Sequence, residues 1–251
     1  MQMNKRIAVA VVVLSLLRAS QAEEAASTSA ITKETFWQET RALVPIQVVL
    51  PPDYDAEEHR TMVMVLHGYA NSVEKFQGPA ERLAAAGFVA VLPESPYAFA
   101  SEWGLGYDWT LYNRGDAALH ERARRLMVTE TLPAIASEVM RRYGIADVYV
   151  LGFSQGARMA VQSCIYASEL FKGAITFGLS EYQPAWFDQS ALESARRIPI
   201  LLFHGEQDEW ASVAISRRAR DHLAAEGFQV SLRLFPVPLV FNQELCLFGR
   251  R

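Results

Sequence analysis

Short, continuous apolar runs alternate along the chain with longer segments in which apolar positions recur at helical spacing. The apolar runs predict buried strands at 44–50, 62–66, 88–92, 148–151, 173–177, 198–203 and 230–235. The helical spacing predicts helices at 73–86, 115–143, 155–167 and 213–225, with a kink or break at Pro133. Strands and helices that alternate in this way indicate an α/β fold with a mostly parallel sheet and helices on both of its faces.

The first residues have the three parts of a secretory signal peptide. Lys5 and Arg6 form a basic start, residues 7–17 are apolar apart from Ser15, and small residues lead up to Ala22. The apolar run is shorter than the ~20 residues that a membrane-spanning helix needs. We therefore expect cleavage near Ala22, a secreted or periplasmic product, and no membrane span after cleavage. An uncleaved anchor or a start codon assigned too early is the alternative.

Composition indicates a single globular domain. The chain has 251 residues, of which 51% are hydrophobic and 21% charged. We expect a signal peptide over 1–22, a lead-in segment over 23–43, an α/β domain over 44–237 and an atypical C-terminal tail over 238–251. The formal net charge of -4 and the lack of a basic block give no electrostatic case for nucleic-acid binding.

The most informative motif has the pattern G-x-S-x-G, with the serine at Ser154. It follows the predicted strand 148–151 and opens the predicted helix 155–167, which places the serine on a tight turn with its hydroxyl projecting from the sheet. Gly152 and Gly156 remove side chains that would clash at such a turn. The amides at the start of the helix favour developing negative charge. The sequence therefore predicts Ser154 as a catalytic nucleophile, with a chance glycine-rich turn as the alternative.

Two motifs carry a resemblance to a known family. Gly-Phe-Ser-Gln-Gly-Ala over 152–157, with Leu-His-Gly-Tyr over 66–69, resembles the phospholipase/carboxylesterase/thioesterase branch of the α/β-hydrolases, which includes acyl-protein thioesterases. Residues 50–54 are similar to the corresponding segment of secreted polyester depolymerases and feruloyl esterases. The resemblance runs from Val44 to Val237. It implies an α/β-hydrolase fold that hydrolyses small-molecule carboxylic esters or thioesters through an acyl-enzyme, without cofactor or metal.

The resemblance also implies roles for individual residues. The backbone N–H groups of Tyr69 and Gln155 would form the oxyanion hole, each stabilising the transition state by ~3 kcal/mol. Asp208, which follows strand 198–203, would be the acid that orients a catalytic histidine. An acidic surface turn is the alternative for Asp208. Trp103 and Trp109, in a segment without a clear period, are predicted to line the acyl or aromatic pocket, with plain cover of the sheet edge as the alternative.

The family's catalytic histidine is missing from its expected place. The last predicted strand is followed by Pro238 and Leu239 where a Gly-His pair is expected, and the usual closing helix is missing or altered. The histidines present are His59, His67, His120, His204 and His222, and none has the family location. His67 and His204 each have a structural interpretation. Three alternatives stay open: an esterase impaired by loss of its base, an inactive ligand-binding relative, or a reading frame shifted or truncated near its 3′ end.

The remaining chemistry-bearing residues give weaker signals. Cys164 and Cys246 are the two cysteines, and export would permit a disulfide between them. A buried free thiol is the expected state of Cys164, because it falls on a predicted core helix. No H-E-x-x-H pattern or clustered His/Asp set favours a metal-dependent hydrolase.

Overall fold

The computed structural model describes residues 38, 42–55, 58, 60–101 and 104–236. The expected signal peptide (1–22) and C-terminal tail (238–251) lie outside these residues, as do His59, Trp103 and Cys246. Within the described ranges, no helix has both the length and the hydropathy that crossing a bilayer requires. Nearly all described residues belong to the segment predicted as the α/β domain.

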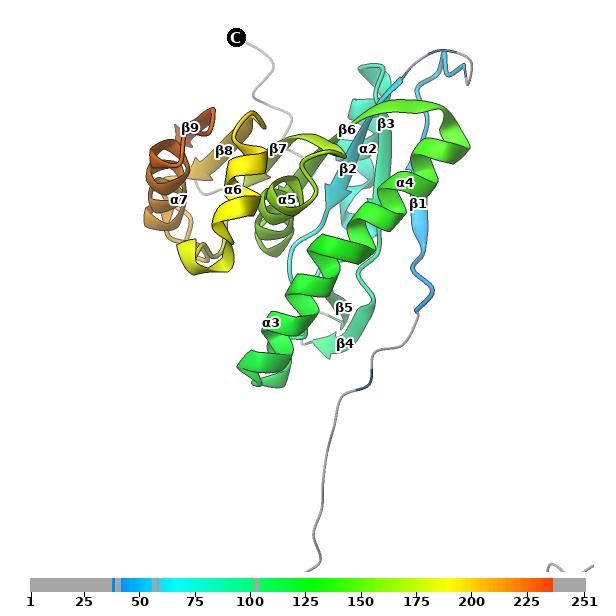
Figure 1. The fold of residues 1–251 in the computed structure, drawn as a ribbon. Coiled ribbons are helices and arrows are strands. Elements are labelled where there is room, and N and C mark those ends of the chain that lie inside the picture. The colour runs from blue at the N-terminus through cyan, green and yellow to red at the C-terminus, as the bar shows by residue number, and fades with distance from the viewer. Residues whose placement is uncertain (1–37, 39–41, 56–57, 59, 102–103, 237–251) are drawn as a thin grey trace, which may run out of the picture. The chain divides into compact units, whose positions relative to one another are not determined.

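A seven-stranded sheet forms the centre of this domain, in the order β1-β3-β2-β6-β7-β8-β9 (Figure 1). Its strands are β1 (Ile46–Val49), β2 (Arg60–Leu66), β3 (Val89–Pro93), β6 (Ile145–Phe153), β7 (Phe171–Phe177), β8 (Ile200–Gly205) and β9 (Val230–Phe235). β1 runs antiparallel to β3, and every other neighbouring pair is parallel. A separate antiparallel hairpin pairs β4 (Tyr97–Ser101) with β5 (Gly104–Asp108).

Helices cover the two faces of the sheet unequally. The turn η1 (Val73–Phe76) and helix α2 (Gln77–Ala85) pack on the side of β1, β3 and β2 that presents Val63 and Val65. The other helices lie over the opposite face (Figure 1). They are α3 (Ala117–Leu126), the π-helical turn η3 (Met127–Thr131), α4 (Leu132–Tyr143), α5 (Gln155–Tyr166), α6 (Gln189–Ala195) and α7 (Val213–Ala225). The larger core lies between these helices and the sheet, because parallel strands bury their apolar residues under helices.

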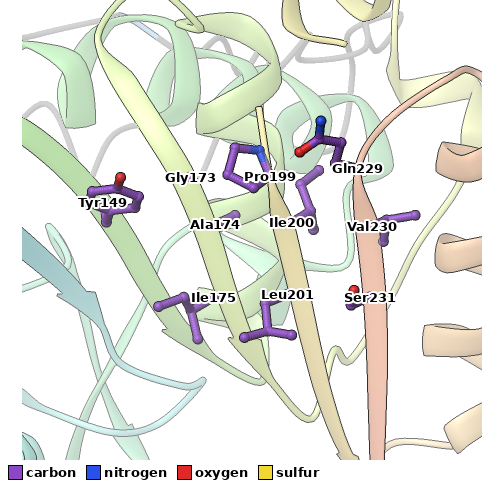
Figure 2. Close-up of a pocket in the computed structure, with 10 residues that line it drawn as sticks. All are labelled: Tyr149, Gly173, Ala174, Ile175, Pro199, Ile200, Leu201, Gln229, Val230 and Ser231. Atoms are coloured by element: carbon purple, nitrogen blue, oxygen red, sulfur yellow. The ribbon is translucent and has the colours of Figure 1, made fainter. Parts of the chain in front are cut away.

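The face of β6–β9 that points away from α5, α6 and α7 is half-buried. A hollow of about 400 Å³ lies on this face. Tyr149, Ile175 and Leu201 are among the residues that line it (Figure 2). Phe177 and Phe203 stack farther along, with ring centroids 4.9 Å apart. Among the described residues, η1 and α2 cover this side of the sheet at β1, β3 and β2 and leave β7–β9 without a helix. The closing helix expected to be missing or altered would follow β9, beyond the described residues.

Most predicted elements are present, and the differences have local causes. α7 and β9 begin and end where the sequence predicts. The predicted helix over 115–143 is divided by the π-helical turn η3 just before Pro133, which lacks the N–H that a regular helix would use. The hairpin β4–β5 and the short helix α6 were not predicted. The two glycines of β5 weaken its strand signal, and α6 is too short to show a period.

Cys164 is a free thiol on α5 with no exposed surface, in agreement with the sequence prediction. Burial raises the pKa of this thiol, so it stays protonated at neutral pH. A protonated, inaccessible thiol is a poor nucleophile, and Cys164 therefore contributes to packing rather than to chemistry.

Candidate active site

Ser154 occupies a sharp turn between β6 and α5. Its backbone has φ 52° and ψ -111°, a conformation that a residue with a side chain adopts only when its surroundings impose it. The adjacent strand helps to hold it, because the N–H of Ser154 donates to the carbonyl oxygen of Phe177 at 2.9 Å. The strand–serine–helix geometry expected from the sequence is therefore present. The catalytic role of the hydroxyl stays a prediction.

Two glycines allow the end of β6 and the start of α5 to pack closely on either side of Ser154. A Cβ atom at Gly152 would overlap the backbone of Gly156. A Cβ atom at Gly156 would lie 2.5 Å from the carbonyl oxygen of His67 and nearer still to that of Leu66. Cβ atoms do not approach carbonyl oxygens so closely, and only glycine fits at both positions. The start of α5 is thus packed directly against the end of β2.

The loop after β2 passes beside Ser154. A Cβ atom on Gly68 would lie 3.4 Å from the Cβ of Ser154, so the residue next to Tyr69 adjoins the serine side chain. β5 supports this loop, because the N–H of Ala70 donates to the carbonyl oxygen of Tyr107 at 3.0 Å. The predicted donor Tyr69 is therefore carried on a loop that has both the serine turn and a β-strand as neighbours.

The backbone N–H groups of Tyr69 and Gln155 have no acceptor within the described part of the chain. Gln155 is the first residue of α5, so its N–H has no partner within the helix. Unpaired donors close to a serine hydroxyl suit an oxyanion that forms during acyl transfer. The assignment of these two amides to an oxyanion hole stays a prediction that the local geometry favours.

His67 holds the loop rather than facing Ser154. Its ring is 1% exposed, and Nδ1 donates to the carbonyl oxygen of Gly68 at 2.8 Å. Nε2 accepts from the N–H of Ser95 at 3.2 Å and also lies 3.0 Å from a carboxylate oxygen of Glu94. Both ring nitrogens are occupied, which agrees with the structural interpretation of His67.

Trp109 differs from its predicted role in the substrate pocket. The side chain has no exposed surface, and its ring packs on that of His67 with centroids 4.8 Å apart. Its indole Nε1–H donates to the carbonyl oxygen of His67 at 2.9 Å. A buried side chain whose N–H is already paired cannot contact a substrate, so Trp109 does not line the substrate pocket. Trp103, the other residue predicted to line the pocket, lies outside the described residues.

Asp208 follows β8 at the same edge of the sheet as Ser154, two strands away, or about 10 Å by the usual strand spacing. Its Oδ1 accepts from the N–H groups of Trp210 at 2.9 Å and Ala211 at 3.0 Å. Oδ2 lies 3.7 Å from Nε2 of His204, and none of the described groups donates a hydrogen bond to it. Oδ1 of Asp208 thus stabilises the turn after β8, and Oδ2 can accept a further hydrogen bond.

The described histidines are engaged elsewhere. His204 has no exposed surface; its Nε2 donates to the carbonyl oxygen of Ala211 at 2.8 Å and its Nδ1 accepts from Ser216 at 2.7 Å. His222 pairs with the Tyr182 hydroxyl at 2.7 Å. Of the histidines in the described ranges, none is hydrogen-bonded to the nucleophile predicted at position 154. The family's base position follows β9 and lies outside the described residues, so its vacancy stays a prediction.

Sequence reasoning missed a buried polar cluster beneath the serine turn. Its members are Asp108, Thr110, Gln155 and Arg158, each 4% exposed or less. Nε2 of Gln155 donates to Oδ1 of Asp108 at 2.8 Å, and Arg158 donates to the hydroxyl of Thr110 at 3.0 Å and to the carboxylate of Glu181. The one signal in the sequence that could have indicated this cluster is the pair of polar residues Gln155 and Arg158 at the start of the buried helix α5.

His120, at the rim of this cluster, predicts a pH dependence of stability. Its Nδ1 donates to the carbonyl oxygen of Thr110 at 3.0 Å. Burial, and then the nearby Arg158, lower the pKa of the half-buried His120 below its usual value. The unfolded chain therefore binds the proton more readily, and stability is lost as pH falls through the unfolded pKa of about 6.5. We expect the urea concentration at the unfolding midpoint of the wild type to be lower at pH 5 than at pH 7.5. In His120→Gln this decrease should be smaller. An equal decrease in the two proteins would contradict the prediction.

Comparisons with known proteins found a matching family model and solved structures that share the fold. The family model described as Phospholipase/Carboxylesterase matches residues 53–238. Esterase PE8 superposes with a TM-score of 0.65 at 22% identity, over 79% of this chain and 92% of that one. A carboxylesterase from Bacillus cereus gives 0.61 at 14% identity over 79% and 88%, respectively. Acyl-protein thioesterase 2 from Zea mays gives 0.54 at 18% identity over 77% and 90%. At these identities the superpositions show a shared fold alone.

Proposed function

Because the chain belongs to the phospholipase/carboxylesterase family of α/β-hydrolases, we propose that it hydrolyses small-molecule carboxylic esters or thioesters with Ser154 as nucleophile. The observation that carries the proposal is the conformation of Ser154, which is held at φ 52° between β6 and α5. Strain of this kind persists only where the surrounding structure maintains it, and it is concentrated at functional sites. The unpaired amides of Tyr69 and Gln155 support the same assignment.

The reaction proceeds in two acyl transfers. Oγ of Ser154 bonds to the acyl carbon as its proton leaves, and the carbonyl oxygen becomes negatively charged next to the two amides. The tetrahedral intermediate expels the alcohol or thiol, which takes a proton from water. Water then attacks the acyl-enzyme, and the carboxylic acid and free Ser154 are released.

Turnover by this chain is slow under the same proposal. In a complete triad a histidine takes the serine proton, and Asp208 would orient its ring. This sequence has no histidine after β9, so the proton passes to solvent. Loss of a triad member lowers the rate by ~10⁴ or more and leaves the contribution of the oxyanion hole and of substrate binding.

A second candidate function is ligand binding without catalysis. The specific observation in its favour is that His67, His120, His204 and His222 are all bonded to other groups. A site with two oxyanion donors but no base could retain esters or carboxylates without converting them.

A fluorophosphonate probe distinguishes the two functions. The proposal predicts covalent labelling at Ser154, located by mass spectrometry, together with measurable hydrolysis of a p-nitrophenyl ester. Ser154→Ala should abolish both while its unfolding temperature stays close to that of the wild type. Folded wild-type protein that neither labels nor hydrolyses the ester would exclude the esterase function and favour ligand binding.

We also propose that the protein is exported and then cleaved near Ala22. The basic start, the apolar run and the small residues before the cleavage position support this. Mass spectrometry of the N-terminus of protein recovered from the expressing cells tests it, and a retained Met1 would rule it out.

A further inference from the structure

We propose that Trp109 is a positioning residue that sets the separation between the two oxyanion donors, the backbone N–H groups of Tyr69 and Gln155. The inference rests on the proposed function, because it assigns a task to a residue outside the reacting groups. Trp109 follows β5, and its two N–H groups reach the two donor segments separately. It therefore joins the loop after β2 to the start of α5 without touching substrate.

The first connection runs from the backbone of Trp109 to the side chain of Gln155. The N–H of Trp109 donates to Oε1 of Gln155 at 3.1 Å. Nε2 of the same amide donates to Asp108 at 2.8 Å and to Thr110 at 3.2 Å. The consecutive residues 108–110 thus bond both the oxygen and the nitrogen of the Gln155 side-chain amide. Gln155 is 4% exposed. Fixing this side chain fixes the Cα of Gln155 and, with it, the direction of the backbone N–H.

The second connection runs from the indole to the loop. Nε1–H of Trp109 donates to the carbonyl oxygen of His67 at 2.9 Å, two residues before Tyr69. On the other side of Tyr69, Tyr107 accepts from Ala70 at 3.0 Å and donates to Asn71 at 3.1 Å. The end of β5 and the residue after it therefore hold the loop both before and after the donor.

The two connections together make the spacing of the donors sensitive to one side chain, in addition to the direct packing of Gly156 on the end of β2. The indole has no exposed surface and packs against the tilted ring of His67, so it cannot shift without moving the loop. Phenylalanine would keep a ring in this position and the backbone N–H to Gln155, but it would lose the hydrogen bond to the loop. The loop after β2 would then be free to move while the start of α5 stays in place. The distance between the backbone nitrogens of Tyr69 and Gln155 would change.

The test compares Trp109→Phe with Trp186→Phe, the same chemical change at a half-buried tryptophan in the turn before α6. Hydrolysis of a p-nitrophenyl ester gives kcat and KM, and phenylboronic acid, which adds to serine as a tetrahedral anion, gives a Kd. We expect Trp109→Phe to lower kcat by about 10- to 100-fold with KM nearly unchanged, because small misplacements of catalytic groups cost that much. The boronate Kd should rise about as much as kcat falls. A purely structural role would lower the unfolding temperature without separating kcat from KM.

Crystal structures of the wild type and both variants supply a readout that needs no activity. The proposal predicts that the distance between the two donor nitrogens changes in Trp109→Phe and is unchanged in Trp186→Phe. An unchanged distance, or kinetic and boronate values equal to those of the control variant, overturns the proposal. If the wild type neither turns over the ester nor binds the boronate, the esterase function fails, and the measured distances still decide whether Trp109 sets the spacing.

Discussion

Replacing Gly156 with alanine is expected to lower the free energy of unfolding by about 3–5 kcal/mol or to prevent folding. The added Cβ would meet the carbonyl oxygens of Leu66 and His67 at the end of β2. These atoms belong to the backbone and have no rotamer by which to move away. Relief requires that α5 separate from the central strands, which would open the core where Ala157 and Ala160 have no exposed surface. Urea unfolding followed by circular dichroism measures the loss.

Gly78→Ala is the matched control for this change. Gly78 lies in the first turn of α2, and an added Cβ would meet no atom within 4 Å. Alanine is the better helix former by up to ~1 kcal/mol, so this variant should be as stable as the wild type or slightly more stable. Equal stability of the two variants would mean that the turn at Ser154 is not packed as described. The comparison separates steric exclusion from the general effect of removing a glycine.

The fold could be predicted because its signals are local and repeated. Each parallel strand of the main sheet contains a short apolar run, and the longer helices show their own period. The ends of α7 carry two further sequence signals. The side chain of Ser212 caps its start, and Gly227 lies shortly after its end. The hairpin β4–β5 could not be recognised in this way, because its two strands are short and one contains Gly104 and Gly106. Gly106 is needed there because the backbone of Ala70 lies against it.

The serine turn could be predicted from one contiguous motif, whereas its supports could not. The contacts that fix Gln155 come from Asp108, Trp109 and Thr110, more than forty positions earlier in the chain. Such pairings depend on how the segment after β5 folds back under α5, and composition carries no trace of that arrangement. For the same reason, the sequence predicts that Trp109 lines the substrate pocket, whereas the folded chain buries it against His67 of the loop after β2. The sequence predicts where the chemistry takes place, and only tertiary packing indicates which residues would position it.

If the protein lacks its base as proposed, added imidazole is expected to accelerate ester hydrolysis by the wild type about 10- to 100-fold at neutral pH, recovering part of a loss of ~10⁴ or more. Asp208 has one carboxylate oxygen held by Trp210 and Ala211 and another that no described group bonds. A free imidazole can donate one N–H to that oxygen and accept the serine proton with its other nitrogen. Phenyl acetate suits the assay, because its poorer leaving group limits the direct reaction with imidazole.

Two variants decide whether the acceleration arises at the proposed site. Ser154→Ala should give the background reaction of imidazole alone. Asp208→Asn retains an oxygen for the N–H groups of Trp210 and Ala211 but removes the charge that would stabilise an imidazolium, so its rescued rate should fall well below that of the wild type. An equal imidazole-dependent rate in all three proteins would place the reaction in solution. No acceleration of the wild type would mean that Ser154 and Asp208 do not leave room for a shared ring, and the acid assigned to position 208 would have to be abandoned.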